Sequence, residues 1–358
     1  MPLFGTLFRN TSSGSDPHTP LPSILSTRRV LIPSRDVYVH DEDQLGSGRL
    51  GSVTGGLWLG QPVAIKRLVT SAEEAQVPGT RARLEKEIAD LIPHLNHPNL
   101  LPLYGIVEMS DGSIGLVFKK GKGGSLKNAI RKHRASGGLP LSDILHVAKG
   151  IASALTFLHN LETPIVYRQL RPGNVILSGD SNPMLDPEFG VIREILKIIT
   201  SRMRLTAVMT SGGNKILDSA YLAPEVLSDD KASSVSSSCA SDIYSLGMVI
   251  LEMTTGQAPF NLLQSDLEVY RAVVVEHERP AIPANVPAPL ASLIKRCIDQ
   301  LPENRPTSRD VLDSLSRIEK ELLANQLPSI SATATFGTGG TTEGSKAESQ
   351  FQNLFTPK

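Results

Sequence analysis

The chain has 358 residues, 40% of them hydrophobic, and carries 36 Lys and Arg against 36 Asp and Glu. This length suits one large bilobal domain or two ordinary ones, and the zero net charge gives no reason to expect nonspecific binding to nucleic acid or anionic membranes. The two cysteines, Cys239 and Cys297, are too few for a disulfide framework and indicate a reducing compartment.

Both ends of the chain differ in composition from its middle. Residues 1 to about 38 and residues 326–358 are rich in Ser, Thr, Pro and Gly, and such segments bury too little apolar surface to offset the entropy lost on ordering. We expect both to be disordered, which leaves 39–325 as the folded region. No apolar run is long enough to span a bilayer, and the first residues lack a secretory signal. We therefore expect a cytoplasmic protein without a transmembrane segment, with a nuclear location left open.

The folded region begins with strands and ends with helices. Two apolar runs are joined by a turn at Gly60–Gln61, and further strands are predicted over 100–108 and 113–120. Apolar residues three and four apart predict helices over about 81–95, 142–160, 241–255, 289–300 and 308–324. Ser142 is the expected N-cap of the second helix. The predicted architecture is α+β, with a small sheet-rich lobe followed by a larger helical lobe.

A glycine-rich stretch lies between the first two predicted strands. Gly46, Gly48 and Gly51 have the spacing of a phosphate-binding loop, where missing β-carbons let backbone amides approach phosphate oxygens. Dinucleotide-binding folds use the same spacing but open a helix there, whereas a strand follows here. Lys66, in the sequence Val-Ala-Ile-Lys, lies on the next strand. Singly these features also fit a flexible turn and a surface lysine, but together they favour phosphate binding.

The loop and the lysine resemble the nucleotide site of eukaryotic protein kinases, nearest the serine/threonine or tyrosine-kinase-like branch, with further motifs in family order over residues 40–324. The resemblance implies a bilobal protein-kinase-like fold with an N-lobe over about 39–118, a hinge over 119–123 and a C-lobe over 124–325. It also implies that Lys66 pairs with a helical glutamate, for which Glu87 is the best match and Glu85 the alternative. A solvated glutamate on an exposed helix face is the competing interpretation for both.

The resemblance implies that the chain binds ATP. Phe118 takes the place of the bulky residue at the back pocket, and the backbone from Lys119 to Gly121 is placed to bond adenine. Val53, Ala64 and Ile176 correspond to the apolar residues around the purine ring. The implied nucleotide-binding residues are Gly46, Gly48, Gly51, Val53, Ala64, Lys66, Phe118, Lys119, Gly121 and Ile176.

The stretch Tyr167–Asn174 resembles the family's catalytic loop except at decisive positions. Gln169 replaces the aspartate that orients the substrate hydroxyl and accepts its proton, and a neutral amide has no comparable basicity. General-base assistance is typically worth about 10²–10⁴-fold in rate. Arg171 replaces a lysine that contacts the transferred phosphate, which keeps the charge but changes its geometry. The implied catalytic residues are Gln169, Arg171, Lys66 and Glu87.

The resemblance also implies two ligands for Mg²⁺. Asn174 is retained, and the Phe189-Gly190 pair makes Glu188 the counterpart of the family's principal metal-binding aspartate. Glutamate is a hard oxygen ligand but is one methylene longer, so we expect a weakened or altered site. Asp186 is the alternative ligand if Pro187 loops outward.

Beyond the metal site, the scaffold motifs of the family are complete. Glu225, at the end of Tyr-Leu-Ala-Pro-Glu, is expected to pair with Arg305. Asp242 matches a buried aspartate at the start of a helix. Both are structural roles that would hold the large lobe together.

The segment before Tyr221 is unusual. The resemblance implies a threonine three residues before Tyr221, where this chain has Asp218, and we expect Asp218 to pair with Arg171 and block a substrate hydroxyl. Residues 191–205 have an apolar helical stripe with basic residues interleaved, which favours packing within the fold over docking to a partner or a membrane. The candidate phosphorylation sites are Thr200, Ser201, Thr206, Thr210 and Ser211.

Two functions fit these changes. The first is a nucleotide-competent pseudokinase that acts as a signalling scaffold or switch. The second is an active but slow serine/threonine kinase, because phosphoryl transfer depends mainly on positioning and electrostatic stabilisation. A pure scaffold with an empty pocket is disfavoured by the intact glycines and Lys66. The expected partners are a nucleotide and a protein partner or substrate, with no nucleic acid.

Overall fold

A computed structural model describes residues 30–48, 51–67, 86, 88, 89, 92, 95–186, 219–228 and 238–326. The chain divides into two compact units, Met1–Lys320 and Glu321–Lys358. The second unit is described only over residues 321–326, which end the last helix. All of the contacts below lie within the first unit.

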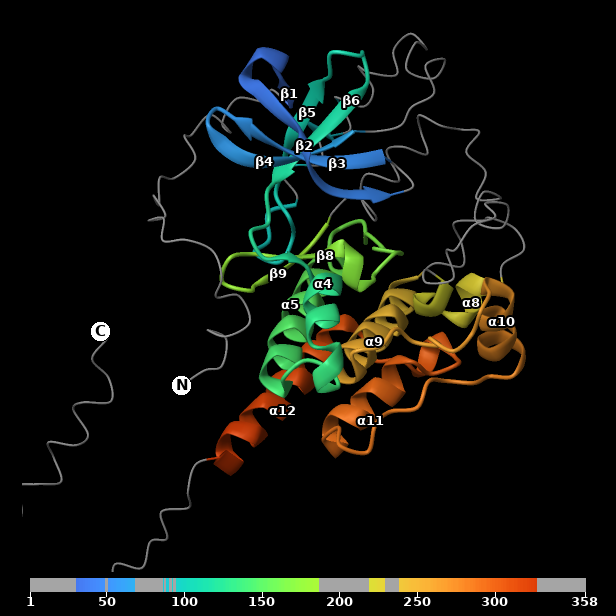
Figure 1. Cartoon of the computed structure of the whole chain (residues 1–358). Helices are drawn as coiled ribbons and strands as arrows, with labels where there is room; N and C mark the ends of the chain where they lie inside the picture. The colour runs from blue at the N-terminus through green and yellow to red at the C-terminus, as the bar shows by residue number, and fades with distance from the viewer. Residues whose placement is uncertain are drawn as a thin grey trace, which may run out of the picture. The chain divides into compact units, whose positions relative to one another are not determined.

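The N-terminal part of the described chain is a six-stranded sheet (Figure 1). Its strand order is β1 (Leu31–Ile32), β5 (Leu103–Glu108), β6 (Ile114–Lys119), β4 (Gln61–Arg67), β3 (Gly51–Trp58) and β2 (Val37–Gly48). The strands predicted from alternating and β-branched residues are confirmed. The turn between β3 and β4 lies at Leu59–Gly60, one residue earlier than predicted, with φ of 48° and 79°. Positive φ at both central residues matches the twist of a two-residue hairpin.

The register of the sheet places several residues on one face. Val53 pairs with Lys66, which pairs with Leu116, and Ala64 pairs with Phe118 on the same face. A core cluster covers this face, consisting of Ile88, Leu101, Leu103, Ile106, Leu116, Phe118 and Met184. Because Met184 lies on β9 (Pro183–Leu185), this cluster joins the sheet to the helical part.

The N-terminal boundary of the fold lies earlier than predicted. Residues 30–38 were expected to be disordered, yet β1 pairs in parallel with β5, and β2 begins at Val37. The Ile106 amide donates to the Val30 carbonyl at 2.9 Å. Gly105 permits this approach, because a β-carbon there would overlap the Val30 carbonyl oxygen. A strand of two residues has no usable periodicity and is ordered only by its distant partner.

The C-terminal part is helical (Figure 1). Its helices are α4 (Leu126–Lys132), α5 (Leu141–His159), α8 (Pro224–Leu227), α9 (Cys239–Thr255), α10 (Asp266–Tyr270), α11 (Ala288–Cys297) and α12 (Ser308–Gln326). A small sheet of β7 (Gly124–Ser125), β8 (Val175–Leu177) and β9 precedes α8. Helix α9 packs against both α5 and α11. The four long helices match predicted ranges, whereas α4, α8 and α10 are too short to show a helical stripe in the sequence.

Two expectations for α5 need correction. Ser142 is not its N-cap, because the helix already begins at Leu141 after Pro140, and the Ser142 hydroxyl lies 3.2 Å from Oδ1 of Asp143. The helix is also long and apolar enough to cross a membrane, with a mean hydropathy of 1.3, contrary to the expectation that no segment would be. However, 61% of that window is buried within the fold, as in many core helices, so the indication of a span is weak.

The predicted helix over 81–95 lies largely outside the described residues. Residues 86, 88 and 89 are helical, and Ile88 is fully buried in the cluster shared with Phe118.

Candidate nucleotide and phosphotransfer site

The sheet face brings together the residues predicted to bind nucleotide. Lys66 is 6% exposed. It pairs with Val53 on β3, and the neighbouring pair on the same face of the sheet is Ala64 with Phe118. A lysine so deeply placed is not the solvated surface lysine considered above. Its predicted partners, Glu87 and Glu85, lie outside the described residues.

The glycine-rich stretch forms the end of the β2–β3 hairpin. Gly46 pairs with Val53, and Gly48 pairs with Gly51. A β-carbon added at Gly46 would meet no atom within 4 Å. The space beside this backbone is therefore open, as a loop that approaches phosphate oxygens requires.

The hinge contacts Ile176, the predicted purine-ring residue that does not lie on the six-stranded sheet. Gly121 packs against Ile176 so closely that a β-carbon at position 121 would overlap the Ile176 side chain. The Lys119 amide donates to the Pro102 carbonyl at 3.0 Å, which fixes the start of the hinge. The structure therefore brings Ile176 to the hinge, and Ile176 packs on the same core cluster as Ala64.

The backbone around Asn99 ties β9 to the sheet. The Leu101 amide donates to the Leu185 carbonyl at 2.8 Å, and the Leu185 amide donates to the Asn99 carbonyl at 2.8 Å. Gly150 on α5 leaves room for this arrangement, since a β-carbon there would overlap Pro183. These bonds fix the point at which the chain leaves β9 and reaches Asp186.

Two backbone amides of the catalytic loop donate hydrogen bonds to one buried carboxylate. The Tyr167 amide donates to Oδ2 of Asp242 at 2.7 Å, and the Arg168 amide donates to Oδ1 at 2.6 Å. Arg168 has a φ of 70°, which is strained for a residue with a β-carbon. Asp242 is fully buried near the start of α9, as predicted. Its two oxygens hold the loop in this strained conformation.

The same loop joins the predicted catalytic and metal-binding positions. The Asn174 amide nitrogen Nδ2 donates to the Gln169 carbonyl at 2.7 Å, which leaves Oδ1 of Asn174 as the atom suited to a cation. The Asp186 amide donates to the Asn174 carbonyl at 3.0 Å, and the Tyr167 hydroxyl donates to the Asp186 carbonyl at 2.9 Å. Asp186, the alternative metal ligand, therefore borders Asn174 through its backbone.

Several predicted features lie outside the described residues. Glu188, Asp218, the stripe over 191–205 and the candidate phosphorylation sites before Tyr221 are among them. Arg171 is half-buried in the catalytic loop, so its predicted pairing with Asp218 stays a prediction. Across the described part of the chain, no three His, Cys, Asp or Glu side chains cluster in a way that could hold a metal ion. Mg²⁺ in proteins usually shares its coordination with phosphates and water.

Sequence patterns did not indicate the side-chain partner of Asp242. His159, at the end of α5, places Nε2 2.9 Å from Oδ2 of Asp242, and its side chain is 7% exposed. Burial alone would lower the pKa of His159, but hydrogen bonds to Asp242 and Cys239 outweigh it and raise the pKa to about 9. The catalytic loop thus rests on a buried ion pair whose two members are separated by 83 positions.

This pair predicts a pH-dependent stability. The pKa of His159 in the folded protein lies above its ordinary value of 6.5. The contribution of the ion pair to the free energy of unfolding is therefore complete below pH 6.5 and is lost as the pH rises through 9. The loss should approach about 3 kcal/mol of unfolding free energy, since each pKa unit corresponds to about 1.4 kcal/mol. Urea titrations at pH 6.5 and 9.5 would show a steep decline for the wild type and a shallow one for His159→Gln. Equal declines in the two proteins would contradict this assignment.

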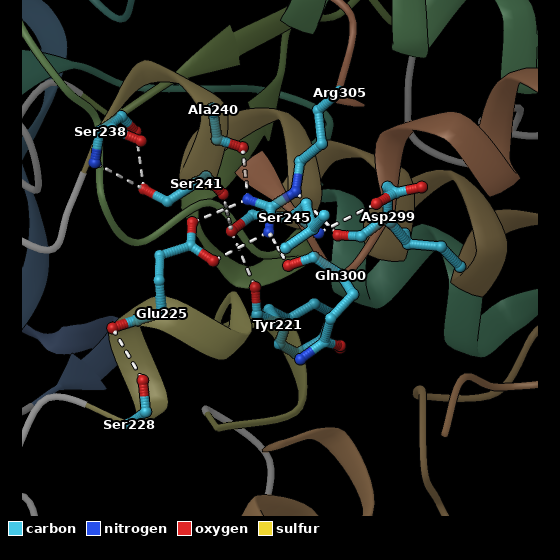
Figure 2. Close-up of polar contacts among 12 residues, drawn as sticks. Tyr221, Glu225, Ser228, Ser238, Ala240, Ser241, Ser245, Asp299, Gln300 and Arg305 are labelled. Atoms are coloured by element: carbon cyan, nitrogen blue, oxygen red, sulfur yellow. Dashed lines mark hydrogen bonds and ion pairs between the residues drawn. The ribbon is translucent and has the colours of Figure 1, made fainter. Parts of the chain in front are cut away.

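A second anchor holds the segment that contains Glu225, as Figure 2 shows. Arg305 donates from Nη1 and Nη2 to the two carboxylate oxygens of Glu225 at 2.7 and 2.8 Å. Nη1 also donates to the Ala240 carbonyl at 3.0 Å, and Nε donates to the Asp299 carbonyl at 2.9 Å. The predicted pair is confirmed. The fork geometry of arginine suits it to this bidentate role, which joins α8 and α9 to the connection between α11 and α12.

The sheet with its buried lysine, the helical part and these two anchors define a bilobal α+β protein-kinase fold. A family model for protein tyrosine and serine/threonine kinases matches residues 39–315 of the chain. The chain therefore belongs to the protein tyrosine and serine/threonine kinase family.

Individual relatives agree with this assignment. The chain is 31% identical over 274 residues to a probable serine/threonine-protein kinase of Dictyostelium discoideum, which covers 76% of this chain and 15% of that protein. It is 29% identical over 290 residues to mitogen-activated protein kinase kinase kinase 10 of Mus musculus, a match that covers 79% of this chain and 28% of that protein. It is 29% identical over 286 residues to the serine/threonine-protein kinase VIK of Arabidopsis thaliana, a match that covers 78% of this chain and 59% of that protein. The chain thus spans less than two thirds of each of these relatives.

Proposed function

We propose that the chain binds ATP between the Lys66 face of the sheet and Ile176 and that it is a catalytically impaired pseudokinase acting as a signalling scaffold or switch. The observation that carries this proposal is Gln169. It stands in a loop whose backbone retains the Asp242 anchor and the bond from Asn174, so the scaffold of a phosphotransfer site surrounds a side chain that cannot act as a base.

The other site residues support nucleotide binding. Lys66 supplies a positive charge on the sheet face, and the open backbone beside Gly46 suits phosphate oxygens. Arg171 adds a guanidinium in the catalytic loop, which favours contact with phosphate. Gln169 would bind a hydroxyl through its amide but would not take up its proton.

We further propose that Asn174 and Asp186 hold Mg²⁺, with Asp186 in the role that the sequence pattern gave to Glu188. The support is the backbone link between Asp186 and Asn174. Both side chains offer hard oxygen ligands. When bound, Mg²⁺ would neutralise charge on the phosphates. Under this assignment the two metal ligands are retained, and the loss of function is confined to the general base at position 169.

An active but slow serine/threonine kinase is the second candidate. Its support is the retention of Lys66, Asn174 and both anchors, together with the serine/threonine kinases among the relatives. Proton removal occurs late in a loose transition state, so loss of the aspartate need not abolish turnover. In either case we propose a protein as the partner or substrate.

Thermal unfolding with ATP tests nucleotide binding. At a concentration 100 times its dissociation constant, ATP should add about 2.7 kcal/mol to the unfolding free energy. Omitting Mg²⁺ should reduce the shift, and Lys66→Met should largely remove it. Lys295→Met, which changes an exposed lysine on α11, should leave the shift unchanged. A wild type that ATP does not stabilise at any concentration would overturn the proposal and favour a scaffold with an empty pocket.

A further inference from the structure

Strand β2 contains an irregularity next to the glycine-rich hairpin. His40 pairs with Gly55 of β3, but the next pair joins Gln44 to Thr54, so residues 41–43 have no opposite residue on β3. The Gln44 side chain donates from Nε2 to the Asp41 carbonyl at 2.9 Å, which closes this bulge. A bulge re-aims the side chains of the bulged strand, and here the last of them is Asp43.

Asp43 reaches across β3 to the hinge. Its Oδ2 lies 2.6 Å from Nζ of Lys120, with the two side chains 39% and 30% exposed. The carboxylate passes over Gly55, and a β-carbon at position 55 would overlap it and lie 3.1 Å from the lysine nitrogen. The missing side chain of Gly55 therefore leaves the space that the Asp43 carboxylate occupies.

The ion pair lies at the hinge end of the nucleotide face. Gly55 pairs with Ala64, and Ala64 pairs with Phe118. Lys120 stands between Lys119 and Gly121, the hinge residues proposed to bond adenine. On the other side, β2 leads from Asp43 directly into Gly46. The pair thus joins the strand that carries the phosphate loop to the segment that holds the base.

We propose that the Asp43–Lys120 ion pair, formed across Gly55, is a clasp that holds the glycine-rich hairpin over the bound nucleotide and slows its release. This inference rests on the proposed nucleotide binding. The residues act by positioning the hairpin. A partly exposed ion pair is worth up to about 1 kcal/mol, so loss of the clasp should speed release by about 2- to 5-fold.

Stopped-flow displacement of fluorescent mant-ADP by excess ATP measures the release rate. Asp43→Asn and Lys120→Met should each speed release by about 2- to 5-fold, and the double variant should be no faster than either. Gly55→Ala should have the same effect, because its methyl group displaces the carboxylate while both charges remain. The charge swap Asp43→Lys with Lys120→Asp should restore slow release, a rescue that a general loosening of the sheet would not produce.

Arg67 and Asp111 provide the matched control. Arg67, at the end of β4, and Asp111, in the turn between β5 and β6, form a partly exposed ion pair. Arg67 pairs with Gly115, at the opposite end of β4 from the hinge, so Arg67→Met should leave release unchanged. Additive effects of the two single variants, or unchanged release in both, would overturn the clasp.

Hydrogen exchange separates this proposal from nucleotide binding itself. In the protein without nucleotide, the amides of residues 44–48 should exchange faster in Lys120→Met than in the wild type. If mant-ADP does not bind at all, the proposed function fails, and this exchange measurement still decides whether the clasp exists. Unchanged exchange would overturn it.

Discussion

Replacing Gln169 with Asp is expected to raise the rate of phosphoryl transfer by about 10²-fold or more, within the range of about 10²–10⁴ that general-base assistance provides. The expectation follows from the loop geometry. Position 169 is fixed by the bond from Asn174 Nδ2 at 2.7 Å and by the Asp242 anchor two residues earlier. A carboxylate introduced there enters a loop that is already held in place. Single-turnover transfer from radiolabelled ATP to a generic protein substrate measures the gain.

Gln169→Asn is the matched control for that gain. It has the length of aspartate without its charge, so transfer should stay at the wild-type level. The metal assignment is tested in the Gln169→Asp background, where Asp186→Asn should abolish the gain and Glu188→Gln should largely preserve it. The opposite pattern would return the metal site to Glu188. Equal rates for the Asn and Asp variants would show that basicity at position 169 is not what limits transfer.

Replacing Asp242 with Asn should lower the unfolding free energy by about 3–5 kcal/mol, the usual cost of breaking a buried ion pair. The two oxygens of Asp242 accept from different amides, those of Tyr167 and Arg168. An asparagine, in either orientation of its amide, places an NH₂ group against one of these N–H donors and leaves it unsatisfied. It also removes the partner of the His159 imidazolium. Urea denaturation at pH 7 measures the difference.

Asp313→Asn makes the same chemical change on an exposed face of α12, where Asp313 has 70% of its side chain exposed. Its effect should stay within about 0.5 kcal/mol. A loss below about 1 kcal/mol for Asp242→Asn would contradict the role of Asp242 as the loop's main anchor.

Local periodicity predicted the parts of the fold that place Lys66. Alternation along β4 and β6 is a property of neighbouring residues, and the cross-strand rows through Ala64 and Phe118 follow once the strands are paired. Helix α9 likewise has a repeating apolar pattern that is long enough to predict a helix. Strand β1 could not be predicted in this way, since its two residues, Leu31 and Ile32, become a strand only beside β5.

The site was predicted where family motifs are unbroken and missed where distant residues meet. Glu225 and Arg305 were paired correctly because both lie in recognisable motifs. His159 and Asp242 are 83 positions apart, and Asp43 and Lys120 are 77 apart, with no local pattern that links them. At the metal site, the spacing from Phe189-Gly190 favours Glu188, with Asp186 as the alternative. The structure describes only Asp186, whose backbone amide donates to the Asn174 carbonyl. Glu188 lies outside the described residues, so the choice between the two ligands stays a prediction.

Transfer or hydrolysis of the γ-phosphate of radiolabelled ATP by the unmodified protein tests the central proposal most directly. With nucleotide binding established by thermal shift, we expect the wild type to release no more labelled phosphate than Lys66→Met does. Transfer by the wild type at the rate of Gln169→Asp, and abolished by Lys66→Met, would contradict the proposal and identify an active kinase.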